Sequence, residues 1–228
     1  MKIGIIGAMD CEIEQFCKDF CAHPSENEGI FEGKFAQHDI YICCCGIGKV
    51  NAAANTQKLC DLYDVDYIIN SGVAGSVSKS LGICDIAISK NLTYHDFHPL
   101  ELLDKYVPNT SVFSADERLV KYACNACEKL ASTNDGFKYQ TGTIVSGDIF
   151  VEDSKYVKQL GDKFGALCTE MEGAAVAHVC VLNKKPFVVI RAISDNADEN
   201  ADISFEKMVQ IAANRASFVA KEIISQSI

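Results

Sequence analysis

The stretches CTEMEGAA at residues 168–175 and FVVIRAISD at residues 187–195 decide the fold. In the first, the carboxylate pair Glu170 and Glu172 stands where an apolar strand runs into an Ala-rich helix. The second is an apolar strand that brings Asp195 to its C-terminal end. Charged residues at the ends of buried strands are costly unless they are paired or functional, and open α/β sheets bind ligands at that edge. The two stretches therefore predict an α/β enzyme that acts on a small molecule through acidic groups.

Length and composition predict one globular unit with a large core. The chain has 228 residues, of which 48% are hydrophobic and 23% are charged, as in ordinary globular domains. We therefore expect a single domain over residues 1–228. The net charge of −10 argues against nucleic acid as a partner, because binding a phosphate backbone requires clustered Lys and Arg. A small neutral ligand is compatible with this charge.

The sequence indicates neither a membrane span nor an export signal. No uninterrupted apolar run reaches the roughly 18 residues of a spanning helix. The N-terminal run Met1–Gly7 is too short for a signal peptide, and we interpret it as the first buried strand. We therefore expect a cytoplasmic protein with no membrane partner.

The chain contains twelve cysteines, which is many for a cytoplasmic protein. Several fall inside predicted elements, and the adjacent Cys43, Cys44 and Cys45 of one strand point to alternating faces of the sheet. A chain of this length needs no disulfides to stabilise its core. We therefore expect reduced, partly buried thiols.

Apolar runs alternate with helical patterns along most of the chain, which favours α/β architecture. The predicted strands are Lys2–Gly7, Ile40–Cys45, Tyr67–Ser71, Ile83–Ile88, Tyr139–Ser146, Gly165–Thr169 and Pro186–Ser194. The predicted helices are Cys11–Phe20, Lys49–Tyr63, Ala115–Ala131, Ser154–Leu160, Glu170–Leu182 and Ile203–Ser225. Residues Glu26–Gly33 indicate a hairpin or an exposed turn, and Asn91–Thr110 is the longest stretch without periodicity. A loop of that length usually serves function or contacts a partner.

Three glycine-containing segments follow predicted strands, at Gly4–Met9, Gly46–Val50 and Ser71–Ser76. The first lacks the G-x-G-x-x-G spacing of dinucleotide sites. The second lacks the first glycine of a P-loop and the Ser or Thr that follows its lysine. Small residues in such turns let backbone N–H groups approach a ligand closely. The three segments therefore predict a ligand that is held partly by backbone.

Three acidic residues are candidates for catalysis. Glu12 follows the first strand, where the alternative is a first-turn acid favoured by the helix dipole. Glu172 has the apolar neighbours Met171 and Gly173–Ala175, which argue against simple solvation. Asp195 follows a strand, where the alternative is an N-cap or an Asx turn. The residues alone leave these alternatives open.

The sequence gives little support for a metal site or for a nucleophilic serine. His95 and His98 have no second ligand pair at metal-binding spacing, and Cys124 and Cys127 have no partner motif. Val145–Gly147 lacks the first glycine of a nucleophile elbow. We therefore expect neither a metal nor a cofactor.

Several segments match one enzyme family in order and cover nearly the whole chain: Met1–Met9 with Glu12, Gly46–Ala53, Ile69–Gly75, Tyr94–Asp96, Val145–Val151, Glu170–Glu172 and Arg191–Asp195. The chain thereby resembles the 5′-methylthioadenosine/S-adenosylhomocysteine nucleosidases, which have the purine nucleoside phosphorylase-like fold. The resemblance implies a three-layer α/β/α domain with a mixed central sheet. It also implies a homodimer that hydrolyses the bond between adenine N9 and ribose C1′ in nucleoside catabolism and methionine salvage.

The resemblance implies roles for individual residues as well. Asp195 would protonate N7 of the leaving adenine, and Glu12 would hold and deprotonate the attacking water. Glu172 would accept a hydrogen bond from the ribose 2′-hydroxyl, with Met171 and Arg191 nearby. The other implied substrate-binding residues contact the base, the ribose, the 5′ region or the turn beside the water: Phe150, Val151, Ser194, Met9, Ile47, Phe205, Val73, Ala74 and Gly75.

Two features depart from the family pattern. Val73 stands where many members carry a hydroxyl residue. The segment Phe97–Thr110 is shorter than the loop that, in relatives, packs at the dimer interface and reaches a neighbour's 5′ pocket. The preference among 5′-substituents therefore stays open.

Three other functions compete with the one that the resemblance implies. A phosphorylase needs cations at its phosphate site, whereas arginine is scarce, only Arg191 lies in a motif, and Glu12 would repel phosphate. Hydrolases of other 6-aminopurine or futalosine-like nucleosides share the fold. A nucleoside-binding protein without activity is disfavoured because Glu12, Glu172 and Asp195 are all present. Fold alone decides among none of these functions.

Overall fold

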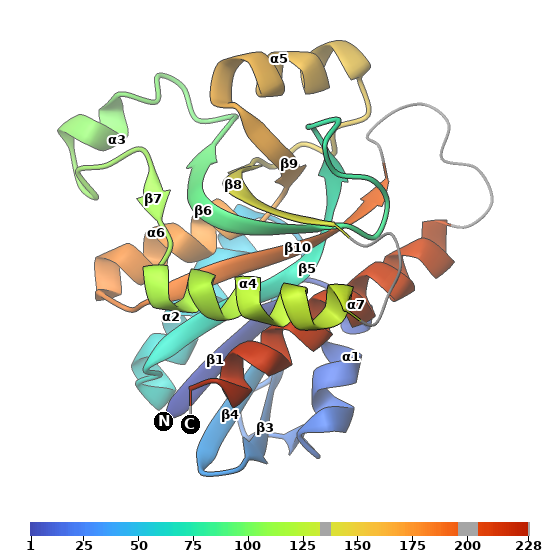
Figure 1. Cartoon of the computed structure of the whole chain (residues 1–228). Coiled ribbons are helices and arrows are strands. Elements are labelled where there is room, and N and C mark those ends of the chain that lie inside the picture. Colours follow the sequence, from blue (N-terminus) through green and yellow to red (C-terminus); the bar gives the residue numbers. More distant parts are fainter. Residues whose placement is uncertain (133–137, 196–204, 228) are drawn as a thin grey trace.

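The computed structural model describes residues 1–132, 138–195 and 205–227, apart from the side chains of Asp195 and residues 205–208. Its elements are arranged as Figure 1 shows. They follow in the order β1 (Lys2–Gly7), α1 (Asp10–Asp19), β2 (His23–Pro24), β3 (Ile30–Phe35), β4 (His38–Cys44), α2 (Lys49–Tyr63), β5 (Tyr67–Ser76), β6 (Ile86–Tyr94), α3 (Leu102–Lys105), β7 (Phe113–Ser114), α4 (Glu117–Ala131), β8 (Tyr139–Ser146), α5 (Ser154–Phe164), β9 (Ala166–Glu170), α6 (Gly173–Asn183), β10 (Phe187–Asp195) and α7 (Phe205–Ser225).

A mixed sheet forms the centre of the fold. β1 pairs in parallel with β4 on one side and with β5 on the other, and β5 pairs in parallel with β10. β3 extends the sheet beyond β4 in the antiparallel direction. Ile3, Ile5 and Ile6 of β1 are fully buried, as expected for a strand that is covered on both faces.

Helices cover both faces of this sheet (Figure 1). On one face α2 and α6 pack together, and Leu59 and Ala177 share a core with Ile6 of β1. On the other face α7 packs against α1 and α4, and Phe16 and Val219 belong to a second core. The three-layer α/β/α arrangement with a mixed central sheet is therefore confirmed.

The sheet also folds back on itself. β10 pairs with both β5 and β6, β6 pairs with β8, β8 pairs with β9, and β9 returns to β5. These pairings close a ring of strands next to the open part of the sheet. Hydrophobic periodicity predicts strands but not their neighbours, so the sequence does not predict this closure.

Two sequence predictions for β5 and β6 are wrong in their bounds. The glycine segment Ser71–Ser76 is not a turn but the second half of β5, because β10 and β9 both pair with it. The strand predicted at Ile83–Ile88 begins at Ile86 and continues to Tyr94. The first residues of the aperiodic stretch Asn91–Thr110 are therefore strand and pair with β8.

The predicted start of one helix near the site is wrong, and that of the last helix is not tested. α6 begins at Gly173 rather than Glu170, because Glu170 ends β9 and its carboxylate accepts the backbone N–H groups of Glu172 and Gly173. Ile203, the predicted start of the last helix, lies outside the described residues. The hairpin expected around Glu26–Gly33 is present, because β3 pairs antiparallel with β2 and β4.

The cysteines are free thiols, as the sequence predicts. Burial raises the pKa of Cys43 to about 12 and that of Cys44 to about 11. Both thiols are therefore protonated and unreactive near neutral pH.

Candidate active site

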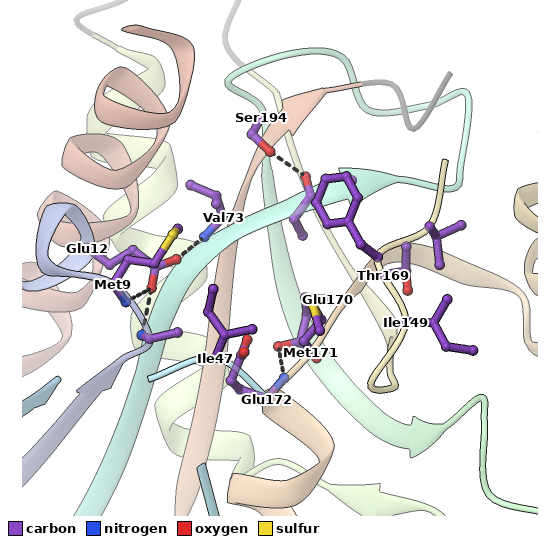
Figure 2. A pocket seen from close by; sticks show the side chains of 15 residues that line it. Met9, Glu12, Ile47, Val73, Ile149, Thr169, Glu170, Met171, Glu172 and Ser194 are labelled. Atoms are coloured by element: carbon purple, nitrogen blue, oxygen red, sulfur yellow. Dashed lines mark hydrogen bonds between the residues drawn. The ribbon is translucent and has the colours of Figure 1, made fainter. Parts of the chain in front are cut away.

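A cavity of about 280 Å³ lies at the C-terminal ends of the sheet strands, and Figure 2 shows its lining. This edge is where α/β sheets bind ligands. Apart from Glu12 in the first turn of α1, the lining residues come from the ends of β1, β4, β5, β8, β9 and β10 and from the turns that follow them. The full lining is Ala8, Met9, Glu12, Ile47, Val73, Ala74, Gly75, Ile149, Phe150, Val151, Thr169, Glu170, Met171, Glu172 and Ser194.

Glu12 is a buried acid in the first turn of α1. Its Oε2 accepts hydrogen bonds from the backbone N–H groups of Ala8 at 2.7 Å and Met9 at 3.0 Å. Its Oε1 accepts one from the backbone N–H of Val73 at 2.9 Å. Hydrogen bonds from backbone N–H groups and the helix N-terminus both stabilise a carboxylate. The Glu12 side chain is thereby fixed between β1 and β5 at the wall of the cavity.

Space for this carboxylate depends on Gly72. A Cβ atom at Gly72 would lie 2.4 Å from Oε1 of Glu12 and 2.9 Å from Nη1 of Arg191. Both distances are shorter than a van der Waals contact, so any larger residue would displace these side chains. A glycine inside a strand is explained here by the close approach of two charged groups.

Glu170 forms a buried ion pair with Arg191 behind the cavity. Nη2 and Nε of Arg191 lie 2.5 Å and 3.2 Å from Oε2 of Glu170. The Ser146 hydroxyl donates to Oε1, and the backbone N–H of Glu172 donates to Oε2 at 3.1 Å. Both charged side chains are only 2% exposed. A buried pair with this many hydrogen bonds holds its geometry firmly, so it fixes the turn between β9 and α6.

Arg191 carries a positive charge close to three carboxylates. Burial alone would lower the pKa of its guanidinium, but Glu170, Glu12 and Glu172 raise the pKa on balance. Nη2 also donates to Oδ1 of Asn70 at 2.7 Å. Arg191 is therefore fully engaged in holding the wall of the cavity.

Glu172 is the N-cap residue of α6 and is buried. Its Oε1 accepts a hydrogen bond from the backbone N–H of Gly48 at 2.8 Å. Burial, and next the charge of Glu170, raise the pKa of Glu172 to about 7, although Arg191 and the Gly48 N–H act in the opposite direction. Near neutral pH this carboxyl group can therefore accept or donate a hydrogen bond.

The raised pKa of Glu172 predicts a pH-dependent stability. The folded protein keeps the Glu172 proton up to a pH of about 7, whereas the unfolded chain releases it at its ordinary pKa of 4.5. The contribution of Glu172 to stability is therefore full below pH 4.5 and is lost as the pH rises through 7. Glu172→Gln should be more stable than wild type at pH 8.5 by up to about 3 kcal/mol and equal to it at low pH.

Urea unfolding at pH 5 and at pH 8.5 measures this difference in the free energy of unfolding. The exposed Glu152→Gln is the matched control and should follow wild type at both pH values. An identical offset between Glu172→Gln and wild type at the two pH values would contradict the raised pKa.

A polar network holds the cavity entrance together. Nζ of Lys49 lies 2.6 Å from Oδ2 of Asp96, and the backbone N–H of Asp148 donates to the same oxygen at 2.8 Å. The backbone N–H of Lys49 in turn donates to Oδ1 of Asp148 at 2.8 Å. This network ties α2 to the ends of β6 and β8, and thereby places Ile47 and Ile149 on the same cavity.

Most residues that the sequence analysis assigns to the ligand lie together. Those that line the cavity are Met9, Glu12, Ile47, Val73, Ala74, Gly75, Phe150, Val151, Met171, Glu172 and Ser194. Arg191 does not line it, because its guanidinium contacts Glu170 and Asn70 instead. Asp195 ends β10 and Phe205 begins α7, but both side chains lie outside the described part of the chain.

Four further lining residues are not assigned to the ligand by the sequence analysis: Ala8, Ile149, Thr169 and Glu170. All four lie within stretches quoted above, but none was given a role toward the ligand. Their position inside these motifs is the signal that could have identified them.

The described residues provide neither a membrane-spanning helix nor a cluster of metal ligands. No helix of residues 1–132, 138–195 and 205–227 is both long enough and apolar enough to cross a bilayer. No group of three or more His, Cys, Asp or Glu within these ranges could hold a metal ion. His95, considered above as a metal ligand, lies 2.9 Å through Nδ1 from the Tyr156 hydroxyl.

Comparison with known proteins gives concordant matches. The model of the phosphorylase superfamily matches residues 2–225. The chain is 38% identical over 234 residues to the 5′-methylthioadenosine/S-adenosylhomocysteine nucleosidase of Haemophilus influenzae, covering 99% of this chain and 100% of that protein. The structure of the present chain matches that of the Neisseria meningitidis nucleosidase in complex with methylthio-immucillin-A, with a TM-score of 0.89, 34% identity and 99% of each chain covered. It also matches the Colwellia psychrerythraea nucleosidase in complex with adenine, with a TM-score of 0.90, 35% identity, and 99% and 95% of the two chains covered.

Proposed function

The chain belongs to the phosphorylase superfamily and, within it, to the 5′-methylthioadenosine/S-adenosylhomocysteine nucleosidases, and on this premise we propose that it hydrolyses the N-glycosidic bond of both nucleosides. The products are adenine and the 5′-thio-substituted ribose. The observation that carries the proposal is the strand-end cavity in which two buried carboxylates, Glu12 and Glu172, have different environments. Such pairs separate the acid, base and binding roles that glycoside hydrolysis requires.

Glu12 is the proposed general base. Its Oε1 accepts a single hydrogen bond, from Val73, among the described residues, and a carboxylate oxygen can accept two. A water molecule can therefore bind to Oε1, with Glu12 held in place by the backbone. The carboxylate would take the proton of this water as it attacks ribose C1′.

Asp195 is the proposed general acid. Adenine is a poor leaving group as an anion, so a proton must reach its N7 as the glycosidic bond breaks. The backbone of Asp195 is placed at the end of β10, in register with Gly75 of β5, which lines the cavity. The strand therefore delivers this acid at the edge of the cavity that the leaving base would occupy.

Glu172 is the proposed partner of the ribose 2′-hydroxyl. Bond cleavage develops positive charge on the ribose ring, and a nearby carboxylate stabilises such charge. Glu172 is held by Gly48 and flanked by Met171, whose side chain also lines the cavity. Arg191 acts indirectly in this proposal, because it fixes Glu170 and the turn before α6.

The remaining lining residues suit an adenine nucleoside with an apolar 5′ group. Phe150 can stack on the base, and the Val151 backbone can bond to its edge. Met9 and Ile47 offer apolar surface to the ribose and the 5′-thio substituent. For Phe205, the same role is proposed from the family resemblance alone. Ser194, Val73, Ala74 and Gly75 would complete the walls.

The charge of the cavity favours hydrolysis over phosphorolysis. The charged side chains among its described lining residues are Glu12, Glu170 and Glu172, all acidic. Glu12 would repel a phosphate ion at the position of the nucleophile. Water is therefore the proposed nucleophile.

The test is release of adenine from 5′-methylthioadenosine and from S-adenosylhomocysteine, with and without phosphate, with the sugar identified. We expect adenine and free methylthioribose at the same rate in both buffers. A phosphate requirement with a ribose 1-phosphate product would overturn the role of Glu12. Base release from a futalosine-like nucleoside alone would move the chain to another substrate class.

We also propose that residues 1–228 form one domain of a cytoplasmic homodimer that serves methionine salvage. Ile47, Ile149 and Phe150 line the cavity with exposed apolar side chains. Val50 and Phe97 are exposed too, and directly follow the ion-paired Lys49 and Asp96. Val50 is 79% exposed and Phe150 is 64% exposed. Such a concentration of exposed apolar groups favours a protein partner, and a second copy would cover it and the cavity entrance.

Light scattering after gel filtration tests the dimer. Wild type should have twice the mass of the chain, and Val50→Glu should shift it towards the monomer. Ile211→Glu is the matched control, because Ile211 is an exposed apolar residue on α7, on the opposite face of the sheet. A monomeric wild type would refute the proposal.

A further inference from the structure

The hydroxyl group of Thr169 has no role in the reaction described above. Thr169 lies in β9, is only 6% exposed and lines the cavity. Its Oγ1 has no hydrogen-bond partner among the described residues. The other buried side-chain atoms without a partner in that part of the chain belong to His38, Ser71, His95 and Ser217, none of which lines the cavity.

A hydroxyl group at a buried strand position needs a hydrogen-bond partner. Burying a hydroxyl group without a hydrogen bond is unfavourable, and its cost is larger in an apolar site. Valine has nearly the same shape as threonine and is equally suited to a buried strand. The Oγ1 of Thr169 is therefore available to a partner that comes with the ligand.

The strand register places Thr169 close to the acid position. Thr169 pairs with Gly75 of β5, and Gly75 pairs on its other side with Asp195 of β10. Neighbouring strands are about 4.8 Å apart, and Gly75 has no side chain to fill the space above it. A flat ligand that lies over Gly75 is thus flanked by the backbone positions of Thr169 and Asp195.

Thr169 also lies at the end of the cavity where the base would bind. Figure 2 shows it across the cavity from Glu12 and Met9 and on the same side as Ile149. Phe150 and Val151, the proposed base-binding residues, follow Ile149 directly in the lining. The water proposed at Glu12 and the base proposed near Thr169 therefore occupy opposite ends.

Adenine has more ring nitrogens than the Val151 backbone and Asp195 can serve, so a further donor at this end would complement the base. Ring nitrogens of a purine accept hydrogen bonds, whereas the ionised carboxylates in the lining only accept them. Of the two lining hydroxyls, that of Ser194 already donates to the backbone oxygen of Ala74 at 3.4 Å. On the basis of the proposed function, we propose that the Thr169 hydroxyl donates a hydrogen bond to a ring nitrogen of adenine other than N7. Thr169 is thereby a specificity-determining residue for the base.

Binding of adenine alone tests the contact without any catalytic step. Titration calorimetry on wild type, Thr169→Val and Thr169→Ser measures the adenine Kd. Loss of one neutral hydrogen bond should weaken binding roughly two- to tenfold in Thr169→Val, whereas Thr169→Ser should stay near wild type.

Ser217→Ala is the matched control. It also removes an unpartnered buried hydroxyl, but on α7 and outside the cavity, so its adenine Kd should equal that of wild type. Equal adenine affinity in Thr169→Val and wild type would overturn the inference. A wild type that binds no adenine would overturn the proposed function, and this inference with it.

Discussion

Glu12→Gln should lower kcat by roughly 10²–10⁴-fold, the range for loss of a positioned general base. The amide keeps the size of the side chain but cannot take the proton of the attacking water. It also has one acceptor oxygen in place of two, so the N–H groups of Ala8, Met9 and Val73 cannot all be satisfied. Steady-state kinetics with 5′-methylthioadenosine measures the loss, and adenine binding should persist because the base lies at the other end of the cavity.

Glu14→Gln is the matched control for Glu12→Gln. Glu14 lies in the same helix but is exposed and pairs with Lys18 at 2.6 Å. Its substitution removes a charge two residues away without touching the cavity, so kcat should stay within about twofold of wild type, as expected of a surface change. A Glu12→Gln enzyme with near-normal kcat would exclude Glu12 as the base.

Asp195→Asn should also lower kcat for 5′-methylthioadenosine by roughly 10²–10⁴-fold, because an amide cannot supply a proton to adenine N7. The size of the loss should depend on the leaving group. A substrate in which 4-nitrophenol replaces adenine on the same 5-methylthioribosyl group releases 4-nitrophenolate. This leaving group is a stable anion and needs no proton. With this substrate Asp195→Asn should approach the rate of wild type.

The two variants separate the two roles. Glu12→Gln should be slow with both substrates, since water must be activated whatever the leaving group is. If Asp195→Asn were equally impaired with adenine and with nitrophenolate, Asp195 would hold the structure of the site rather than donate a proton. Full activity of Asp195→Asn on 5′-methylthioadenosine would exclude the acid role altogether.

Much of the fold and of the candidate site can be predicted from local patterns. The run Lys2–Gly7 reads as a buried strand because its apolar residues are continuous, and the structure confirms these bounds. The helix Lys49–Tyr63 is likewise confirmed. The motif order that indicates the family consists of short contiguous segments, and most of their assigned residues do line one cavity.

Contacts between segments that are distant in sequence determine the remaining features of the fold and of the site. Ser71–Ser76 is strand because β9 and β10 pair with it, and no local pattern of glycines encodes those partners. The pairing of β5 with β1 brings the Val73 N–H to Glu12, 61 residues away in sequence. The pairing of β5 with β9 sets Thr169 across from Gly75.

The sequence by itself thus determined which segments are apolar enough to be buried and which acids stand at their ends. Only the tertiary structure decided that Arg191 supports Glu170 behind the cavity, and that Thr169 lines the cavity with an unpaired hydroxyl. The physical reason is that burial propensity is a property of each local segment. Hydrogen-bond partners and cavity walls depend instead on strand register, which arises when the sheet closes.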